Sequence, residues 1–280
     1  MLHFTNPSMN KIVLITGSST GIGRETALYF AQKGWQVAAT MRNPDKENGL
    51  QNNSNIHLFQ LDVTCQESIQ RAVEKVILKF GKIDVLVNNA GFSVTGIFEG
   101  ISDEDLKHQF NTNVFGLMQL TKAVLPHMRH QKSGCIINVS SIAGKLALPL
   151  FSVYHATKFA VEGFSESLQY ELRPFNIKVK LIEPGIIYTD FYERSMILAK
   201  KDDVKDYEIF FRKVKKMIDT LSGISGSKPI VVAKEIYTAA VSDNYRLRFP
   251  VGGGAVPFLF LRKILPGRLF RKVVYTLMYR

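Results

Sequence analysis

Short runs of β-branched and other apolar residues alternate along the chain with longer stretches in which apolar residues recur every three or four positions. The short runs predict strands and the longer stretches predict helices, because the two structures repeat a buried face with different periods. The predicted strands cover residues 11–16, 35–40, 56–61, 83–87, 135–139, 177–182 and 246–249. The predicted helices run from the turn after Gly17 to about residue 33 and over residues 66–80, 102–130, 152–172 and 207–221.

Several of the predicted strands are almost continuously apolar, which is typical of a sheet covered by helices on both faces. Strands that alternate with helices at this spacing predict one α/β domain with a doubly wound parallel sheet of about seven strands. Ligand sites in such sheets lie beyond the carboxyl ends of the strands. The residues that directly follow each strand are therefore the first candidates for chemistry.

Three of these connections carry glycine or short polar residues. Residues 16–23 read TGSSTGIG and lie between the first strand and the first helix. Glycines allow a tight turn there and let backbone N–H groups approach a pyrophosphate at the helix N-terminus. Asp62-Val63 and the segment 88–91, which reads NNAG, follow the third and fourth strands and suit close backbone approach to a ligand. Taken singly, each segment is also compatible with an ordinary turn.

The end of the second predicted strand carries a cation and lacks an acid. Thr40 and Met41 are followed by Arg42, and the next acidic residue is Asp45. An acid at this point hydrogen-bonds the adenosine ribose of NAD, whereas an arginine pairs with a 2′-phosphate. The sequence therefore favours NADP(H) over NAD(H), with a solvated loop charge as the alternative interpretation of Arg42.

Tyr154 and Lys158 lie four residues apart in a predicted helix and so share one face. An ammonium group beside a tyrosine favours the phenolate and lowers the phenol's pKa, which makes the hydroxyl a usable proton donor or acceptor. The same spacing is common on solvated helix faces. His155, beside the tyrosine, is predicted to point to another face of the helix and is assigned no role.

Two further polar positions bear on the chemistry. Ser141 follows the fifth predicted strand, thirteen residues before Tyr154, and a hydroxyl there is placed to hydrogen-bond a substrate oxygen. Ser140 has the same chemistry. Asn113 lies within the long predicted helix, where asparagine competes for backbone hydrogen bonds, so a local distortion of that helix is one interpretation.

Together these residues resemble the short-chain dehydrogenase/reductase family. The matching elements are Thr16-Gly17-xxx-Gly21-x-Gly23, Asp62, Asn88-Asn89-Ala90-Gly91, Asn113, Ser141, Tyr154-xxx-Lys158, Pro184-Gly185 and Thr189. They occur in the family's order and span about residues 10–190, and the ordered set is far more specific than any one motif. The resemblance implies a single Rossmann domain over residues 1–280 and an NAD(P)-dependent dehydrogenase or reductase acting on CH–OH groups.

The resemblance also implies a role for each site residue. Tyr154 is the general acid in reduction and the base in oxidation, and Lys158 lowers its pKa and holds the nicotinamide ribose. Ser141, selected over Ser140 by its spacing, positions the carbonyl or hydroxyl, and Asn113 supports a water linked to Lys158. The implied cofactor-binding residues are Thr16, Gly17, Ser19, Thr20, Gly21, Ile22, Gly23, Arg42, Asp62, Val63, Asn89, Ala90, Gly91, Tyr154, Lys158, Pro184, Gly185, Ile187 and Thr189. No metal is implied.

Within the family, the segment that ends in Arg42 resembles members that prefer NADP. Thr20 stands where a basic residue often precedes the second motif glycine, which weakens the preference without reversing it.

The substrate is expected to be hydrophobic. Residues 190–228 form the least family-like part of the chain and are predicted to be a substrate-loop insertion. Apolar residues flank the site: Phe92, Val94, Leu146, Leu148, Leu150, Phe151 and Val153, with Met196, Ile197, Leu198, Phe210 and Phe211 in the insertion. The layout resembles the 17β-hydroxysteroid and retinol dehydrogenase branch, which implies a steroid, retinoid or fatty-acyl-like alcohol or carbonyl. A 3-ketoacyl-carrier reductase and a non-catalytic NADPH-binding sensor or scaffold remain alternatives.

Charge is concentrated at the C-terminal end of the chain. The 36 basic and 24 acidic residues give a net charge of +12, and the stretch from Arg246 to Arg280 holds eight basic residues and no acidic ones. Residues 255–280 mix these cations with apolar residues, which predicts a basic amphipathic tail with anionic lipid as one candidate contact. A helix covering the substrate cleft and a dimer contact are the alternatives, and no nucleic-acid-binding motif is present.

The remaining composition fits a cytoplasmic protein, with membrane association through the tail as an option. Two cysteines, Cys65 and Cys135, are too few for a disulfide framework. No apolar stretch is long enough for a spanning helix, and the N-terminus does not have the pattern of a secretion signal. By resemblance, the chain is expected to form a homodimer or homotetramer through the helices that carry Asn113 and Tyr154.

Overall fold

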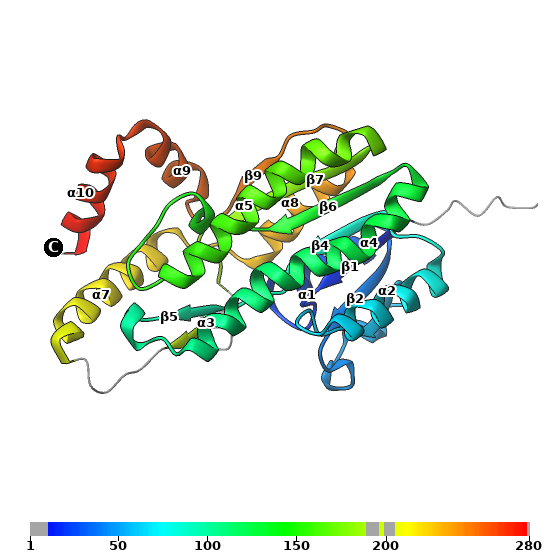
Figure 1. The fold of residues 1–280 in the computed structure, drawn as a ribbon, viewed down its shortest axis with the longest axis horizontal. Helices are drawn as coiled ribbons and strands as arrows, with labels where there is room; N and C mark the ends of the chain where they lie inside the picture. The colour runs from blue at the N-terminus through cyan, green and yellow to red at the C-terminus, as the bar shows by residue number, and fades with distance from the viewer. Residues whose placement is uncertain (1–10, 189–195, 199–204, 279–280) are drawn as a thin grey trace, which may run out of the picture.

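The computed structural model describes residues 11–188, 196–198 and 205–278. Seven parallel strands form one sheet in the order β3-β2-β1-β4-β6-β7-β9, with helices on both faces (Figure 1). These strands are β1 (Ile12–Thr16), β2 (Gln36–Met41), β3 (Ile56–Gln60), β4 (Val85–Asn88), β6 (Gly134–Val139), β7 (Ile177–Pro184) and β9 (Arg248–Val251). The predicted doubly wound parallel sheet is confirmed.

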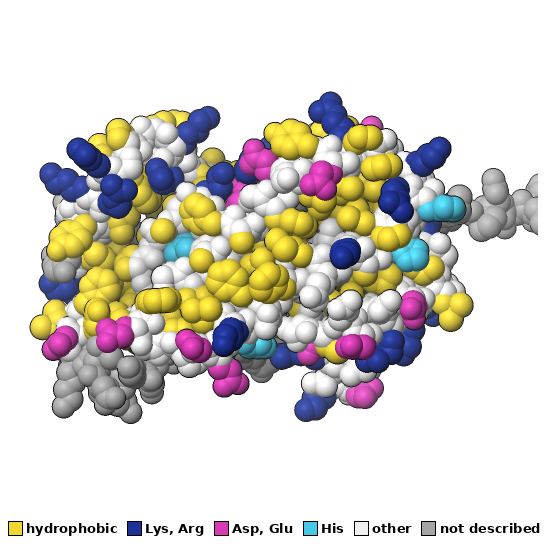
Figure 2. Space-filling model, in the orientation of Figure 1, with side chains coloured by type: hydrophobic (Ala, Val, Ile, Leu, Met, Phe, Trp, Pro, Cys, Tyr) yellow, Lys and Arg dark blue, Asp and Glu magenta, His cyan; other side chains and the backbone are white. Residues whose placement is uncertain are grey.

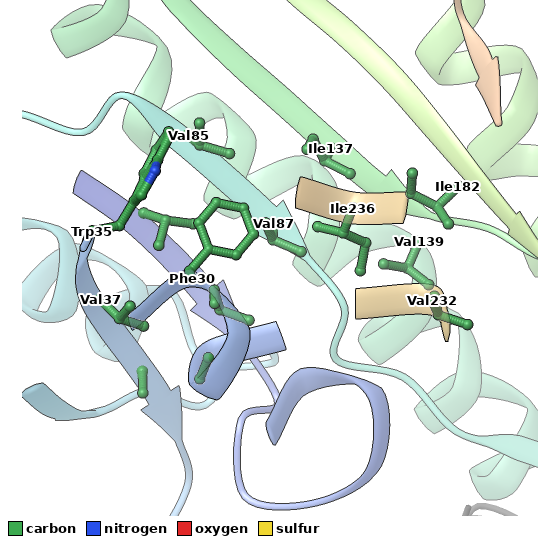
Figure 3. Close-up of a cluster of buried hydrophobic side chains, with 14 of the residues drawn as sticks. Phe30, Trp35, Val37, Val85, Val87, Ile137, Val139, Ile182, Val232 and Ile236 are labelled. Carbon is green, nitrogen blue, oxygen red and sulfur yellow. The ribbon is translucent and has the colours of Figure 1, made fainter. Parts of the chain in front are cut away.

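Alternating side chains of β1 point into two separate cores. Val13 and Ile15 of β1 pack with α1 (Gly21–Gln32) and α8 (Pro229–Val241), through residues such as Phe30 and Ile236. Figure 3 shows this cluster between the strands and the two helices. Leu14, between them, faces the second core, which α2 (Gln66–Phe80), α4 (Leu117–Gln131) and α5 (Ser152–Leu172) complete. Most residues of β1, β2, β4 and β6 are apolar and buried because both faces of the sheet are covered.

The long helix predicted over residues 102–130 is wrong as a continuous element. It is divided into α3 (Asp103–Phe110), a π-helical stretch η4 (Asn111–Gly116) and α4. A Cβ added at Gly116 would lie 2.6 Å from the Val63 carbonyl oxygen, and the Asn113 side chain is bonded to the backbone of Phe92. The local distortion considered for Asn113 is therefore present, and its cause is tertiary contact rather than helix propensity.

An outer lobe lies beyond the carboxyl ends of the sheet strands (Figure 1). We define it by β5 (Ser93–Thr95), β8 (Met196–Leu198), α7 (Glu208–Ser225), α9 (Ala255–Ile264) and α10 (Gly267–Met278). β5 and β8 pair in parallel, and a small core of Leu150, Val214, Met217 and Met278 joins α7 and α10 to the loop before α5. The three-residue strands β5 and β8 are too short to show a periodic pattern in the sequence. The sequence analysis also did not predict α8.

Short 3₁₀ helices connect the larger elements. They are η1 (Pro44–Lys46), η2 (Leu50–Asn52), η3 (Phe98–Gly100), η5 (Ile142–Gly144), η6 (Arg173–Phe175) and η7 (Lys205–Tyr207). The strand predicted at 246–249 is observed two residues later, because the pairing with β7 begins at Arg248 opposite Leu181. Among the helices described, none is long and apolar enough to cross a membrane.

Candidate active site

A cavity of about 530 Å³ opens at the carboxyl ends of β1, β2, β4, β6 and β7. Most of the predicted cofactor residues line it. They are Thr16, Gly17, Ser19, Thr20, Gly21, Ile22, Arg42, Asp62, Val63, Asn89, Ala90, Gly91, Tyr154, Lys158, Pro184, Gly185 and Ile187. Ser141 lines the cavity too, so three of the four predicted catalytic residues and one continuous row of cofactor candidates share one space.

Three predicted site residues do not line this cavity. Gly23 packs beneath the glycine turn, where an added Cβ would lie 2.2 Å from the Gly17 carbonyl oxygen. Asn113 is buried behind the wall formed by Phe92. Thr189 lies outside the described residues.

Side chain to backbone hydrogen bonds hold the glycine turn in place. Thr16 Oγ1 accepts from the backbone N–H groups of Asn89 and Ala90, both at 2.9 Å. In return Asn89 Nδ2 donates to the carbonyl oxygens of Thr16, at 2.9 Å, and Gly17, at 3.2 Å. Gly17 and Gly21 adopt left-handed φ angles of 66° and 55°, which side chains with a Cβ rarely tolerate. The turn is thus built before any ligand arrives.

The N-terminus of α1 faces the cavity without a cap from its own sequence. Its N-cap residue Thr20 makes no side-chain capping bond, and the first turn holds no acidic residue. The first N–H groups of a helix and its dipole favour an anion at this position. A pyrophosphate at the glycine turn would satisfy donors that the chain leaves open.

Near the ends of β2 and β3 the cavity is lined by one acidic side chain, Asp62, and one basic side chain, Arg42. Asp62 Oδ1 accepts from Thr64 N at 2.9 Å and Thr64 Oγ1 at 2.7 Å, so this carboxylate shapes the turn after β3. Arg42 is exposed at the end of β2, where Gln60 donates to its carbonyl oxygen. The guanidinium is available for an anionic group at the rim of the cavity.

Lys158 is buried against the end of β6. Its ammonium group donates to the Val139 carbonyl oxygen at 2.8 Å and lies 5.6 Å from the centre of the Tyr154 ring. Burial lowers the pKa of Lys158 to about 8, and the negative charge of Glu162 opposes that shift. The lysine therefore changes charge only about one pH unit above neutrality, beside a phenol that also lines the cavity.

Both serines after β6 reach the cavity wall. Ser141 Oγ accepts from Ala143 N at 3.1 Å and donates to the Pro184 carbonyl oxygen at 3.3 Å. Ser140 is 3% exposed and its hydroxyl has no partner among the described residues. Position alone does not choose between them, and Ser141 is preferred for its spacing from Tyr154.

Asn113 joins the two walls of the site from behind. Its amide accepts from Phe92 N at 3.0 Å and donates to Phe92 O at 2.8 Å and to Thr157 Oγ1 at 3.2 Å. Thr157 Oγ1 in turn donates to the carbonyl oxygen of Tyr154. The asparagine side chain thus ties the segment before β5 to the helix that carries the tyrosine.

His155 was left without a role by the sequence, yet it lines the cavity and is only 6% exposed. Its Nε2 accepts from Leu148 N at 2.8 Å, so Nδ1 carries the proton and donates to the Ala143 carbonyl oxygen at 2.8 Å. Burial lowers the pKa of His155. The ring holds the loop after Ser141 against α5, a role that no sequence periodicity signals.

The mouth of the cavity on the lobe side is apolar and aromatic. Phe92, Leu148 and Phe151 line it, and Phe92 stacks on His108 with ring centres 4.8 Å apart. Other apolar residues expected near the site pack elsewhere: Val94, Leu146, Leu150 and Val153 are buried, and Phe210 and Phe211 pack in the lobe core. Nothing is described for the side chains of residues 196–198.

The sequence pattern of the family described as short chain dehydrogenase matches residues 11–197. This chain belongs to the short-chain dehydrogenase family. The match covers the whole cavity region and ends within the predicted insertion at 190–228. This short-chain dehydrogenase is an oxidoreductase, and its fold binds NAD(P).

Two relatives are similar to this chain over most of their length. The chain is 41% identical over 242 residues to a 3-ketodihydrosphingosine reductase of Bacteroides thetaiotaomicron, which covers 86% of this chain and 88% of the relative. It is 33% identical over 289 residues to retinol dehydrogenase 8 of Bos taurus, covering 96% and 91% respectively.

Solved structures of the family superpose on the same architecture. A short-chain dehydrogenase from Streptomyces avermitilis aligns with a TM-score of 0.80 at 35% identity, covering 90% of this chain and 92% of that one. A structure of ElxO with NADP bound aligns with a TM-score of 0.74 at 32% identity, covering 89% and 99%.

Proposed function

We propose that this short-chain dehydrogenase uses NADP(H) to interconvert a hydrophobic alcohol and its ketone or aldehyde, with Tyr154 as the acid/base group. The observation that carries the proposal is one cavity with a prepared glycine turn at one end and Tyr154, Lys158 and Ser141 at the other. The bound cofactor would supply or accept the hydride. The protein has to supply orientation and a proton.

The residues around the reacting carbon have distinct tasks in this proposal. Ser141 Oγ–H turns from the Pro184 carbonyl oxygen toward the substrate oxygen and orients it. Tyr154 donates its phenolic proton to that oxygen in reduction and accepts one in oxidation. The ammonium group of Lys158, 5.6 Å from the ring centre, favours the phenolate and replaces part of the solvation that burial removes.

The cofactor preference rests on the rim at the end of β2. Arg42 is exposed there, and no acid stands near enough in sequence to bind a ribose hydroxyl. Solved structures of the similar protein ElxO contain NADP and, in a variant, NADPH, which supports NADP(H). Arg42→Asp is expected to raise the KM for NADPH about 10–100-fold and to improve NADH use, because one charge-assisted bidentate contact is lost and a repulsion gained.

The substrate class follows from the apolar mouth formed by Phe92, Leu148 and Phe151. The two curated relatives are named for retinol and 3-ketodihydrosphingosine, both long apolar molecules, and they support a lipid-like alcohol or carbonyl. A long-chain ketone is therefore expected to be reduced with a much lower KM than a short polar one. Activity confined to acyl-carrier thioesters would instead favour the ketoacyl reductase alternative.

The decisive test is the pair of wild type and Tyr154→Phe, assayed for NADPH consumption with steroids, retinal and long-chain ketones. The variant should lose at least about 10²-fold in kcat while its Kd for NADPH stays within a few-fold, because the ring and its packing remain. A wild type that binds NADPH but consumes none with any of these carbonyls would favour the sensor or scaffold alternative.

We also propose that α9 and α10 rest on an anionic membrane surface. Val256, Phe260 and Ile264 lie four residues apart along α9 and are 60%, 62% and 56% exposed. Cations flank this stripe at Arg262, Lys263, Arg268, Arg271 and Lys272, and Figure 2 shows them gathered over the two helices. An exposed apolar stripe with cations beside it fits the interface of a negatively charged bilayer.

Vesicle co-sedimentation tests this surface. The protein should sediment with phosphatidylserine-containing vesicles, not with pure phosphatidylcholine, and salt should weaken the binding. Phe260→Ser should reduce binding several-fold, whereas Leu78→Ser, on the exposed face of α2, should not. Equal binding of both variants would exclude α9 as the contact.

We further propose a homodimer or homotetramer through the face of η4 and α5. Phe115 and Phe159 are 51% and 47% exposed, and Figure 2 shows hydrophobic side chains gathered over this face. Exposed aromatic residues on packed neighbouring helices suit a second copy of the chain. Sedimentation equilibrium should show a multimer for the wild type and a lower mass for Phe159→Glu, and a wild-type monomer would contradict the proposal.

A further inference from the structure

Two carboxyl groups that the proposed reaction does not use are buried beside the active-site lysine. Glu162 lies one turn after Lys158 on α5 and is 4% exposed. Glu183 directly precedes Pro184 on β7 and is 2% exposed. Both converge on Arg248 Nε of β9, at 2.9 Å from Glu162 Oε2 and 3.5 Å from Glu183 Oε1. The pair therefore lies directly behind the cavity wall.

Among the described residues, Arg248 is the cation in ion-pair contact with both carboxyl groups. Arg248 also binds Glu166 through Nη2 at 2.6 Å, so three carboxyl groups share one guanidinium. Lys145 and Lys158 are the other cations that act on the pair. Like charges in contact under low dielectric are costly, and one of the two buried groups is stabilised by keeping its proton.

The hydrogen bonding around Glu162 and Glu183 also indicates that one of the two carboxyl groups is protonated. Glu162 Oε1 and Glu183 Oε1 are buried without a hydrogen-bond partner among the described residues, and so is Ser140 Oγ. An added Cβ at Gly144 would lie 2.8 Å from Glu162 Cγ and 2.9 Å from Ser140 Oγ, so both side chains pack against that glycine. Carboxylates only accept, whereas a protonated carboxyl supplies the donor that these oxygens lack.

The titration of the groups agrees with this geometry. Burial raises the pKa of Glu183 to about 7, the charge of Glu162 and a hydrogen bond to it add to the shift, and Arg248 and Lys145 oppose it. The charge of Glu162 also favours the ammonium form of Lys158. Glu183 is therefore the member of the pair whose protonated form burial favours.

We propose that Glu162 and Glu183 share one proton and act as a positioning pair that sets the charge of Lys158. The inference rests on the proposed function for its catalytic consequence, because Lys158 is useful to Tyr154 only while it is an ammonium. Ionised Glu162 stabilises that ammonium, and the proton on Glu183 prevents a second negative charge from disrupting the contact between Glu162 and Arg248.

Infrared difference spectroscopy of the wild-type protein tests the shared proton without any turnover. A carbonyl stretching band of a buried protonated carboxyl should be present at pH 6 and disappear as the pH rises through about 7. The Glu183→Gln variant should lack the band, and Glu166→Gln, which removes the more exposed carboxylate on Arg248, should retain it. A wild type without the band at pH 6 overturns the proposal, whether or not any variant folds.

The pH dependence of protein stability is a second test of the shared proton. An acid with a raised folded pKa binds its proton more tightly when folded, so the contribution of Glu183 to stability should fall as the pH rises from about 4.5 to 7 and then level off. Glu183→Gln should flatten that part of the profile, and Glu166→Gln should not. Parallel profiles for wild type and Glu183→Gln overturn the proposal.

Kinetic profiles separate the pair's role from simple structural support. Glu162→Gln should move the alkaline limit of kcat down by about one pH unit, because Lys158 loses its neighbouring charge. Glu183→Gln should remain within about threefold of wild type at pH 6, since glutamine resembles a protonated glutamate. An unchanged alkaline limit in Glu162→Gln overturns the link to Lys158. A wild type with the infrared band but no turnover supports the proton sharing and contradicts the proposed function.

Discussion

The glycine-turn side of the cavity and the outer lobe both lie beyond the carboxyl ends of the sheet strands, and each is stabilised by different interactions. Thr16 and Asn89 hold the turn through four hydrogen bonds to backbone groups. The lobe depends on apolar contacts among Leu150, Val214 and Met217 with the end of α10. Directional bonds define one backbone shape, whereas apolar packing tolerates changes of side chain that keep volume.

This difference indicates which region of the molecule tolerates changes in its amino-acid sequence. A turn that presents backbone N–H groups to a pyrophosphate has to keep its geometry whatever the substrate is. A lobe stabilised by apolar contacts tolerates changes of side chain more readily.

The sharpest contrast comes from two glycine substitutions. Gly23→Ala places a Cβ 2.2 Å from the Gly17 carbonyl oxygen, whereas Gly163→Ala on α5 meets nothing within 4 Å. The first should cost about 3 kcal/mol or more and abolish NADPH binding, and the second should be neutral or stabilising by up to about 1 kcal/mol. Urea unfolding and NADPH fluorescence titration measure both. Equal stabilities would show that the turn is less constrained than its contacts indicate.

A smaller loss is expected from Thr16→Val, which keeps the shape and removes the hydroxyl. The N–H groups of Asn89 and Ala90 then lose their common acceptor, and two part-buried donors without partners should cost about 1–2 kcal/mol in total. Thr16→Ser, which keeps the oxygen, is the matched control and should recover most of the stability. If valine and serine behave alike in chemical denaturation, the hydrogen bonds are not what holds the turn.

On the lobe side, Met217→Ala should act locally. Met217 is 6% exposed in the lobe core, so its truncation should cost about 2 kcal/mol of packing there. Amide hydrogen exchange should accelerate in α7 and α10 while the protection of β1 and β4 is unchanged. The KM for a hydrophobic substrate should rise and the Kd for NADPH should not. Faster exchange throughout the sheet would mean that the two regions are one cooperative unit.

The smallest effect is expected at the junction of the two regions, where His155 holds the loop after Ser141. Burial lowers the pKa of His155, so the unfolded state takes up a proton first as the pH falls below 6.5. The histidine should therefore reduce stability progressively below pH 6.5, and the loss should level off below its folded pKa. His155→Gln should cost about 1 kcal/mol at pH 7 and flatten this acid limb. An unaltered acid limb in thermal melts at pH 5–7 would assign the dependence to another group.

The sequence predicted the nucleotide side better than the lobe. The strands, the glycine turn and the order of the polar motifs follow from local patterns, because each motif sits at the end of a strand with a clear apolar run. The sequence indicated a distortion of the helix at Asn113 only as one interpretation, and it did not predict β5 or β8. These features depend on close approach to Val63, on bonds to Phe92 and on pairing between segments about a hundred residues apart.

By itself, the sequence determined the alternation of strands and helices, the family, and the order in which Tyr154, Lys158 and the glycine turn appear, because periodicity and spacing are local properties of a chain. Only the tertiary structure decided that His155 faces the cavity, that Asn113 braces its wall and that Glu162 meets Glu183 behind Lys158. Those side chains come from different elements, and burial, which sets their charge and hydrogen bonding, exists only once the elements have packed.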